Sequence, residues 1–332
     1  MSNTLRWGLL STAGINKALL EPLRQSPHSE LVAVASRDVE KAKLYAGEED
    51  IPIAHGSYEA LLADPHVDVI YNPLPNILHA DWTILAADAG KHVLCEKPIV
   101  TSLSDLARVE AAATRNGVTV FEAFMYLHHP QTRRLLELVN TGALGRLQMI
   151  TSWFHFYLPV ERANNIRLRP ELDGGSLWDV GVYPNSAAVA LTGGRAPQDV
   201  WATQQIGETG VDVLMNAHLR FDDGAVAQIS SGLRQPGRGA LHVVGDAGEA
   251  FVKTPWKPDL EGPNGIELIG RNGAREVETF APVNPYLCEV QAMEACVLDG
   301  ADPIVPLSLS REFLKSALAI YASAREGVVI AE

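Results

Sequence analysis

Two short stretches of the chain carry residues that could move a proton on or off a hydroxyl group. Lys97 lies in Glu96-Lys97-Pro98, directly after an apolar segment, and Tyr183 ends the stretch that begins at Gly174. A phenol with its ordinary pKa of ~10 is a poor base at neutral pH, but a nearby ammonium group favours the phenolate and lowers that pKa. Lysine and tyrosine together therefore predict an acid/base pair for an alcohol. Asp179, four residues before Tyr183, shares a helix face with it and could hold Lys97 or a substrate hydroxyl.

The residues around Lys97 belong to an alternating series of buried strands and helices. We expect strands at 5–11, 31–35, 67–71, 92–95 and 118–121, and helices at 15–25, 39–48, 57–63, 79–89 and 103–114. Continuous apolar and β-branched runs are typical of parallel strands that are buried on both faces. The series predicts a doubly wound parallel sheet of the Rossmann type, in which ligands bind at the carboxyl ends of the strands. Lys97 follows such an end.

The pattern changes after about residue 125. Helices are expected near 130–140 and 177–191, a long strand at 145–157, and then several strands in succession between 199 and 252. Successive strands joined by turns predict an antiparallel or mixed sheet in an α+β domain. We therefore divide the chain into a dinucleotide-binding domain, 1–125, and a substrate-binding and oligomerisation domain, 126–332. Helices near 286–298 and 308–325 end the chain, and the last one is expected to pack back on the first domain.

The first strand leads into a turn of small residues that could approach a pyrophosphate. Ser11 and Ala13 stand where a dinucleotide fingerprint has its first two glycines. After the second strand, an NAD enzyme usually places an acidic residue for the ribose. This chain has Ser36-Arg37 instead, with Lys41 one turn later, and a guanidinium group suits a phosphate. The pattern favours NADP; NAD remains the alternative, because Asp38 could serve the ribose if the register moves.

A stiff loop after the fourth strand is expected to form a shelf for the cofactor. Its two prolines restrict the backbone, and its residues follow the strand end as Glu96 and Lys97 do. The cofactor contacts predicted at these two strand ends are Asn72, Pro73, Leu74, Asn76, His79, Glu96 and Lys97.

Composition excludes several classes of protein. The 332 residues include 27 Lys plus Arg and 40 Asp plus Glu, which gives a net charge of −13. A net-acidic surface repels nucleic-acid backbones, and no apolar run approaches the ~20 residues that span a bilayer. The absence of a signal-like N-terminus and the three scattered cysteines predict a cytoplasmic protein with reduced thiols. His128-His129 lacks the other ligands of a metal motif, so we predict no metal.

These segments together resemble one family, the glucose–fructose oxidoreductase/inositol dehydrogenase (Gfo/Idh/MocA) family of NAD(P)-dependent oxidoreductases. The resemblance rests on Trp7–Ile15, Glu96-Lys97-Pro98, Glu122–Tyr126 and Gly174–Tyr183, and covers nearly the whole chain. It is nearest to the branch of NADP-dependent D-xylose 1-dehydrogenases and dimeric dihydrodiol dehydrogenases, although Leu127 stands where that branch often has Arg. The resemblance implies that Lys97, Asp179 and Tyr183 are catalytic. It further implies cofactor contacts from the turn after the first strand, at Ser11, Thr12, Ala13 and Ile15. It also implies an open-faced C-terminal sheet that pairs subunits, hence a homodimer or homotetramer.

The expected activity is hydride transfer between NADP and the carbinol carbon of a sugar or polyol, most simply an aldose oxidised at C1. The alternatives are a ring-ketosugar reductase, a trans-dihydrodiol dehydrogenase and, in another class, a dinucleotide-binding regulator without turnover. The residues that could contact substrate are Tyr126, His155, Arg167, Asn185 and Tyr286.

Overall fold

The chain forms two compact units in the computed structural model, which describes residues 4–162 and 164–331. The first unit contains residues 1–128 and 284–307, and the second contains 129–283 and 308–332. The segment that returns to the first unit therefore carries helix α9 (Pro285–Leu298), whereas α10 (Leu307–Glu326) lies in the second unit from Ser308 onward. The expectation that the last helix packs back on the first domain stays a prediction. Within the first unit, Glu294 of α9 accepts hydrogen bonds from the hydroxyls of Ser26 and Ser29.

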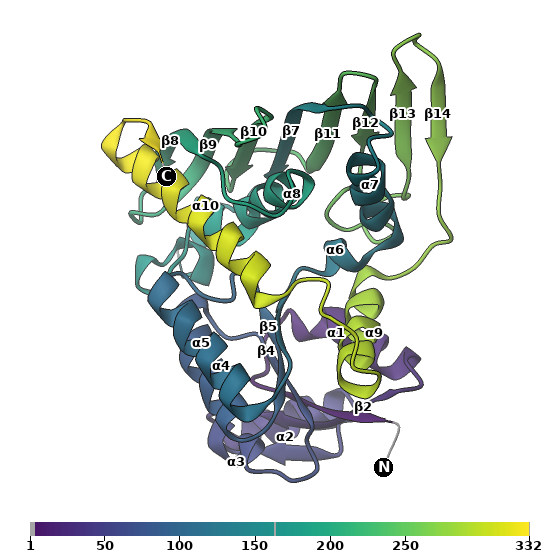
Figure 1. The fold of residues 1–332 in the computed structure, drawn as a ribbon. Coiled ribbons are helices and arrows are strands. Elements are labelled where there is room, and N and C mark those ends of the chain that lie inside the picture. Colours follow the sequence, from purple (N-terminus) through teal and green to yellow (C-terminus); the bar gives the residue numbers. More distant parts are fainter. Residues whose placement is uncertain (1–3, 163, 332) are drawn as a thin grey trace. The chain divides into compact units, whose positions relative to one another are not determined.

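The first unit is built on a six-stranded sheet in the order β3-β2-β1-β4-β5-β6 (Figure 1). All its neighbouring strands pair in parallel, so the predicted doubly wound sheet is confirmed. Its strands are β1 (Leu5–Leu9), β2 (Ser29–Ala35), β3 (Ile53–His55), β4 (Val69–Asn72), β5 (His92–Glu96) and β6 (Val120–Ala123).

Helices connect these strands and begin and end where local chemistry requires. The Ser57 hydroxyl caps α3 by accepting the Ala60 N–H, and Gly117 ends α5 in the left-handed region, with φ +62°. Pro22 lies inside α1, which nevertheless continues to Gln25. The helices are α1 (Asn16–Gln25), α2 (Val39–Glu48), α3 (Tyr58–Leu62), α4 (His79–Asp88), α5 (Leu103–Asn116) and α6 (Met125–His128), with a 3₁₀ turn at Asn76–Leu78.

The second unit is built on a nine-stranded sheet in the order β14-β13-β12-β11-β7-β10-β9-β8-β15. Strand β10 pairs with β7 in parallel and all other neighbours pair antiparallel, so the sheet is mixed but mostly antiparallel. Its strands are β7 (Leu147–His155), β8 (Asp199–Ile206), β9 (Asp212–Arg220), β10 (Val226–Gly232), β11 (Gly239–Gly245), β12 (Gly248–Val252), β13 (Ile266–Gly270), β14 (Arg275–Glu278) and β15 (Ile330–Ala331).

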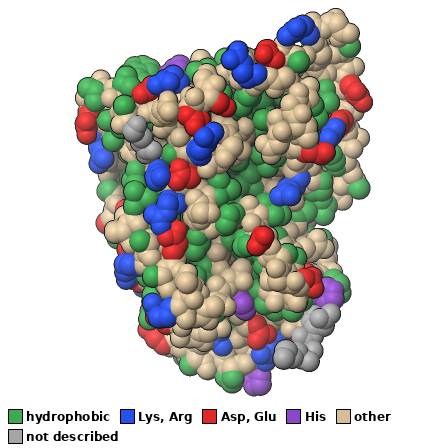
Figure 2. All heavy atoms as spheres, in the orientation of Figure 1, with side chains coloured by type: hydrophobic (Ala, Val, Ile, Leu, Met, Phe, Trp, Pro, Cys, Tyr) green, Lys and Arg blue, Asp and Glu red, His purple; other side chains and the backbone are tan. Residues whose placement is uncertain are grey.

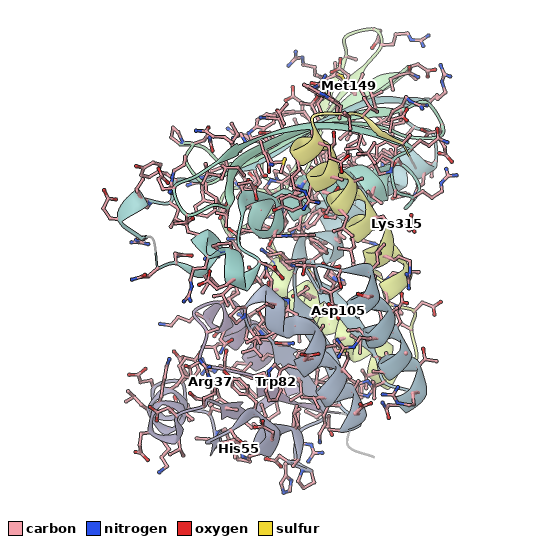
Figure 3. The ribbon with its side chains drawn as sticks, turned by 90° about the vertical axis from the view of Figure 1, so that its left-hand side faces the viewer. Arg37, His55, Trp82, Asp105, Met149 and Lys315 are labelled. Carbon is pink, nitrogen blue, oxygen red and sulfur yellow. The ribbon has the colours of Figure 1, made fainter. Side chains whose placement is uncertain are left out.

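One face of this sheet is covered by helices and the other is open. Helices α8 (Val182–Leu191) and α10 lie along the same face (Figure 1), and α7 (Pro130–Asn140) belongs to the same unit. Strand β7 alternates accordingly: Ile150 and Phe154 are buried, whereas Met149 and Trp153 are half-buried on the open face. In Figure 3, Met149 marks the open face and Lys315 marks α10.

Charged side chains of both signs lie on the surface of the molecule. Figure 2 shows Lys and Arg side chains interspersed with Asp and Glu on the face that it draws. Among the residues that the structure describes, no helix is long and apolar enough to cross a membrane.

Candidate active site

Lys97 lies in a tightly held turn at the carboxyl end of β5. The Lys97–Pro98 peptide bond is cis. The Tyr71 hydroxyl, from the end of β4, donates a hydrogen bond of 2.6 Å to Oε1 of Glu96. Burial and the Glu96 carboxylate raise the pKa of Tyr71 well above its usual range, so the phenol stays a donor. The residue before Lys97 is therefore fixed to the neighbouring strand.

The residues after Lys97 are held as well. The Ile99 N–H donates to Oε1 of Glu122 at 3.0 Å. Both ring nitrogens of His79 lie at hydrogen-bond distance from main-chain carbonyl oxygens, Nδ1 at 2.7 Å from Pro98 and Nε2 at 2.6 Å from Leu74. Burial lowers the pKa of His79. Because its ring is buried and both nitrogens are engaged, His79 joins the two loops rather than presenting a free nitrogen to a cofactor.

Asn72 likewise supports the loop in which it lies. Its Nδ2 donates to the His79 carbonyl and to the Thr83 hydroxyl, and its Oδ1 accepts the Leu74 N–H. Pro73 and Leu74 are buried, whereas Asn76 is half-buried. The predicted shelf is thus a rigid loop whose exposed part is small.

The turn after β1 has room for a phosphate group. Ser11 has φ +136°, a conformation that favours glycine, and its buried hydroxyl has no hydrogen-bond partner. Thr12 and Ala13 are half-buried, Ile15 is exposed, and a Cβ added to Gly14 would meet no atom within 4 Å. The strained serine, its unpaired hydroxyl and the open space suit a dinucleotide pyrophosphate.

The end of β2 distinguishes between the two cofactor interpretations. The Asp38 carboxylate caps α2 by accepting the N–H groups of Glu40 and Lys41, so a helix already engages it. The Ser36 hydroxyl accepts the Asp38 N–H at 3.2 Å. Arg37, labelled in Figure 3, is exposed, as is Lys41. The cations are therefore available for an anionic group, as NADP requires.

Tyr183 lies at the start of α8, after an unusual helical turn. Leu177–Gly181 is a π-helix, and the α-helix begins only at Val182. The expectation that Asp179 and Tyr183 share a face rested on α-helical spacing, and a π-turn changes the rotation between them. Oδ2 of Asp179 accepts a hydrogen bond of 2.7 Å from Nε of Arg167. The structure thus brings together a predicted catalytic residue and a predicted substrate residue.

The Tyr183 ring is set among aromatic side chains. Its centroid lies 5.3 Å from that of Phe154, edge to face, and 5.8 Å from that of Trp256. Tyr183 is 4% exposed. Aromatic packing of this kind fixes the direction of the phenol.

Two of the residues predicted to contact the substrate, His155 and Asn185, make hydrogen bonds to other parts of the protein. His155 lies on the open face of the sheet, where Nε2 is 2.8 Å from the Ser230 hydroxyl and the ring lines a cavity of about 340 Å³. Strand alternation places Phe154, not His155, against Tyr183. Asn185 is buried; its Nδ2 donates to the Phe313 carbonyl and its Oδ1 accepts from Ser316. Its amide therefore attaches α10 and is not free for a substrate.

The two other predicted substrate residues are buried in the first unit. Tyr126 is 0% exposed and packs edge to face on Phe124, with centroids 6.1 Å apart. Tyr286 is 5% exposed and begins α9, where the Asn284 side chain caps the helix. One turn later, Glu289 is fully buried and neither of its oxygens has a hydrogen-bond partner. Burial and the Glu96 carboxylate raise the pKa of Glu289 well above its usual range.

Sequence reasoning missed several residues that hold the site, namely Tyr71, Glu122, Ser176, Asp212, Glu289 and Tyr321. Only Glu122 and Ser176 lie in segments that the family resemblance singled out. The others are single polar residues in apolar strands and helices, and their partners lie far away along the chain. Among residues 4–162 and 164–331, no group of three or more His, Cys, Asp or Glu side chains is arranged to hold a metal ion.

Comparisons of sequence match both units of the chain. The profile of an oxidoreductase family with an NAD-binding Rossmann fold (Gfo/Idh/MocA) matches residues 5–124, and that of the Gfo/Idh/MocA C-terminal domain matches residues 132–251. A D-xylose 1-dehydrogenase (NADP(+)) of Haloferax volcanii is 41% identical over 328 residues, which cover 98% of this chain and 99% of the relative.

Comparisons of structure agree with this result. The aldose–aldose oxidoreductase of Caulobacter crescentus, in complex with glycerol, superposes with a TM-score of 0.90 at 27% identity, over 99% of this chain and 100% of the other. A 3-ketoreductase of Actinomadura kijaniata, in complex with NADP and TDP-benzene, superposes with a TM-score of 0.86 at 30% identity, over 98% of each chain.

Proposed function

Since the chain belongs to the Gfo/Idh/MocA family of oxidoreductases, we propose that it is an NADP-dependent sugar dehydrogenase that oxidises an aldose at C1. D-xylose and D-glucose are the model substrates. The observation that carries the proposal is the 41% identity, over essentially the full length of both chains, with an NADP-dependent D-xylose 1-dehydrogenase. The exposed Arg37 and the helix-capping role of Asp38 support NADP as the cofactor.

Two predicted catalytic residues supply the groups for the proton transfer in this proposal. Bound NADP provides a nicotinamide ring that accepts a hydride from the carbinol carbon. Tyr183 takes the proton of the reacting hydroxyl, and the Lys97 ammonium favours the phenolate form that this step needs. Asp179, which already holds Arg167, orients the substrate together with that guanidinium group. In the reductive direction Tyr183 donates the proton.

A panel of sugars tests the proposal. NADP and NAD are offered separately with D-xylose, D-glucose, other aldoses, polyols and a trans-dihydrodiol, and formation of the reduced cofactor is followed by absorbance. We expect turnover of an aldose with NADP. The absence of turnover with every substrate would refute the enzyme assignment and leave a dinucleotide-binding regulator.

A single substitution tests the assignment of NADP as the cofactor. Arg37→Ala removes the guanidinium proposed to bind the adenosine phosphate, so the KM for NADP should rise about 10- to 100-fold, as expected when charged hydrogen bonds of about 1.5–3 kcal/mol are lost. The KM for NAD should hardly change. Lys43→Ala, an exposed cation of α2 that pairs with Glu40, is the matched control. Equal effects of Arg37→Ala on both cofactors would contradict the assignment.

A ketosugar reductase is the second candidate. Its support is the 30% identity and full-length superposition with the Actinomadura kijaniata 3-ketoreductase. A ring ketone uses the same acid/base tyrosine in the reductive direction. A direct assay distinguishes the two candidate functions, because only a ketosugar reductase oxidises NADPH when a ketosugar is supplied.

We further propose that two or four copies associate through the open face of the nine-stranded sheet. Trp201 and Val226 are exposed large apolar residues on its strands, at 43% and 39%, and an uncovered sheet face with such residues is suited to a partner. The three free cysteines support a reducing, cytoplasmic location. Sedimentation of the wild type and of Trp201→Glu tests the association; an unchanged oligomer would exclude this face.

A further inference from the structure

The helical segment that leads to Tyr183 needs support from outside itself. Its first turn, Leu177–Gly181, is a π-helix, a geometry that is rare and occurs mostly as single turns at functional sites. Its N-terminal residue, Ser176, has no side-chain capping bond to the helix. The contacts that fix this turn therefore come from other elements of the second unit.

One buried carboxylate supplies these contacts. Asp212, at the start of β9, is 3% exposed. Its Oδ2 accepts hydrogen bonds from the Ser176 hydroxyl at 2.6 Å and from the Leu177 N–H at 2.9 Å. Its Oδ1 accepts a hydrogen bond of 2.7 Å from the Tyr321 hydroxyl of α10. A single side chain thus connects a strand, the π-turn and the last helix.

Glycines at both ends of the turn make this approach feasible. Gly175 has φ +129°, and a Cβ there would lie 2.1 Å from Oδ1 of Asp212 and 3.0 Å from the Tyr321 hydroxyl. A Cβ on Gly181 would lie 2.8 Å from the Ser231 hydroxyl, which is itself 3.0 Å from the Ser176 hydroxyl. A larger residue at Gly175 would crowd the carboxylate, and one at Gly181 would crowd the Ser231 side chain.

The protonation states suit an anchor. The Ser176 hydroxyl, the Leu177 N–H and the Tyr321 hydroxyl all donate to Asp212, so the ionised carboxylate satisfies these three groups. Burial raises the pKa of Asp212 while these hydrogen bonds oppose the rise. Burial and Asp212 raise the pKa of Tyr321 well above its usual range, which keeps the phenol a donor. The Trp178 ring, 5.2 Å from the Tyr321 ring, packs against this cluster.

We propose that Asp212, with Ser176 and Tyr321, is a positioning cluster that sets the direction of Asp179 and Tyr183. The inference rests on the proposed function, in which Tyr183 moves the substrate proton. The cluster itself touches no reacting atom. It acts because Leu177 is two residues before Asp179 and six before Tyr183, so a displaced first turn moves both side chains. The last helix is thereby part of the catalytic geometry, through the Tyr321 hydroxyl.

Asp212→Asn tests the cluster, because asparagine keeps the size but places an NH₂ group against one of the donors. We expect kcat to fall about 10- to 100-fold, as displacements of about 1 Å do in active sites, with the affinity for NADPH unchanged. If Tyr183 is displaced, the Lys97 ammonium group favours its phenolate form less. The pH at which kcat reaches half of its maximum, here called the midpoint, should therefore move upward. A loss of stability alone would lower the active fraction without moving that midpoint.

Asp199→Asn is the matched control, since Asp199 lies on the neighbouring strand β8 and its carboxylate pairs with Arg220. It should leave both kcat and the midpoint unchanged. Tyr321→Phe removes one donor and keeps the ring, so it should produce a smaller change in the same direction, even if Asp212→Asn folds poorly. Wild-type values of kcat and midpoint in both cluster variants would overturn the proposal.

Hydrogen exchange separates this proposal from the proposed function. The Leu177 amide donates to Asp212, so it should exchange faster in Asp212→Asn than in Asp199→Asn. If the wild-type enzyme turns over no substrate, the proposed function fails, while the exchange result still decides whether Asp212 holds the turn. Unchanged exchange would contradict the cluster by itself.

Discussion

Two buried carboxyl groups, one in each unit, lie close to the segments that carry Tyr183 and Lys97, and their surroundings are opposite. Asp212 is met by three donors. Glu289 is equally buried, but neither oxygen has a hydrogen-bond partner, and the Glu96 carboxylate adds to the rise of its pKa. Burial raises the pKa of both groups. The number of hydrogen-bond donors around each carboxyl group therefore decides which protonation state its surroundings favour. Asp212 is suited to serve as an ionised anchor, and Glu289 as a neutral acid.

The two segments are also held in different ways. The Lys97 turn has three separate attachments, Tyr71 to Glu96, Glu122 to Ile99 and His79 to Pro98. At the start of the π-turn before Tyr183, Ser176 and Leu177 both donate to the one carboxylate of Asp212. Displacement of that carboxylate therefore affects both contacts together, whereas the loss of one contact from the Lys97 turn leaves the other two.

The largest effect is expected from Gly175→Ala. The added Cβ meets Asp212 at 2.1 Å in a backbone conformation that alanine disfavours, so strain and crowding should together lower the free energy of unfolding by about 2–4 kcal/mol. Gly142→Ala is the control in the same unit. Gly142 also has positive φ, +71°, but open space around it, and its loss should be about 1–2 kcal/mol. Urea unfolding measures both, and equal losses would contradict the close approach at Asp212.

A smaller effect, with a defined pH dependence, is expected from Glu289→Gln. Above the ordinary glutamate pKa of about 4.3, the unfolded chain releases the proton that folded Glu289 retains, so wild-type stability falls as pH rises toward the elevated folded pKa. Glutamine has no such proton. The variant should match the wild type near pH 4 and gain on it with rising pH, by at most about 1.4 kcal/mol per unit.

Glu294→Gln is the control for this measurement. It lies on the same helix and is buried, but it accepts hydrogen bonds from two serines. Because this carboxylate already has hydrogen-bond donors, the variant should be no more stable than the wild type. A Glu289→Gln variant that is less stable than the wild type at pH 8 would mean that Glu289 is ionised and paired, and the contrast with Asp212 would be lost.

The fold of the first unit could be predicted because its signals are local. Apolar runs, caps such as Ser57 and stops such as Gly117 each act within one element, and the strand ends then locate Lys97 and Arg37. The second unit was predicted only in outline. Strand alternation along β7 decides that Phe154 rather than His155 faces Tyr183, and the sequence does not say which face the helices cover.

The supporting residues could not be predicted for a different reason. Asp212 is more than thirty residues away from Ser176 along the chain and more than one hundred away from Tyr321. Nothing in the sequence spacing links these residues. The same holds for Asn185, whose position beside Tyr183 suggested a ligand contact although its amide binds the last helix. Catalytic residue types were recognisable, whereas the residues that hold them depend on tertiary contacts.

The most direct test of the central claim is the transfer of deuterium from C1 of a labelled aldose to the cofactor. Wild-type protein is incubated with D-xylose deuterated at C1 and NADP, and the product is analysed by mass spectrometry, with Tyr183→Phe in parallel. We predict NADPH that carries the deuterium in the wild type, and bound cofactor without turnover in the variant. Unlabelled NADPH, or equal turnover by Tyr183→Phe, would contradict a dehydrogenase that removes the C1 hydride with Tyr183 as its base.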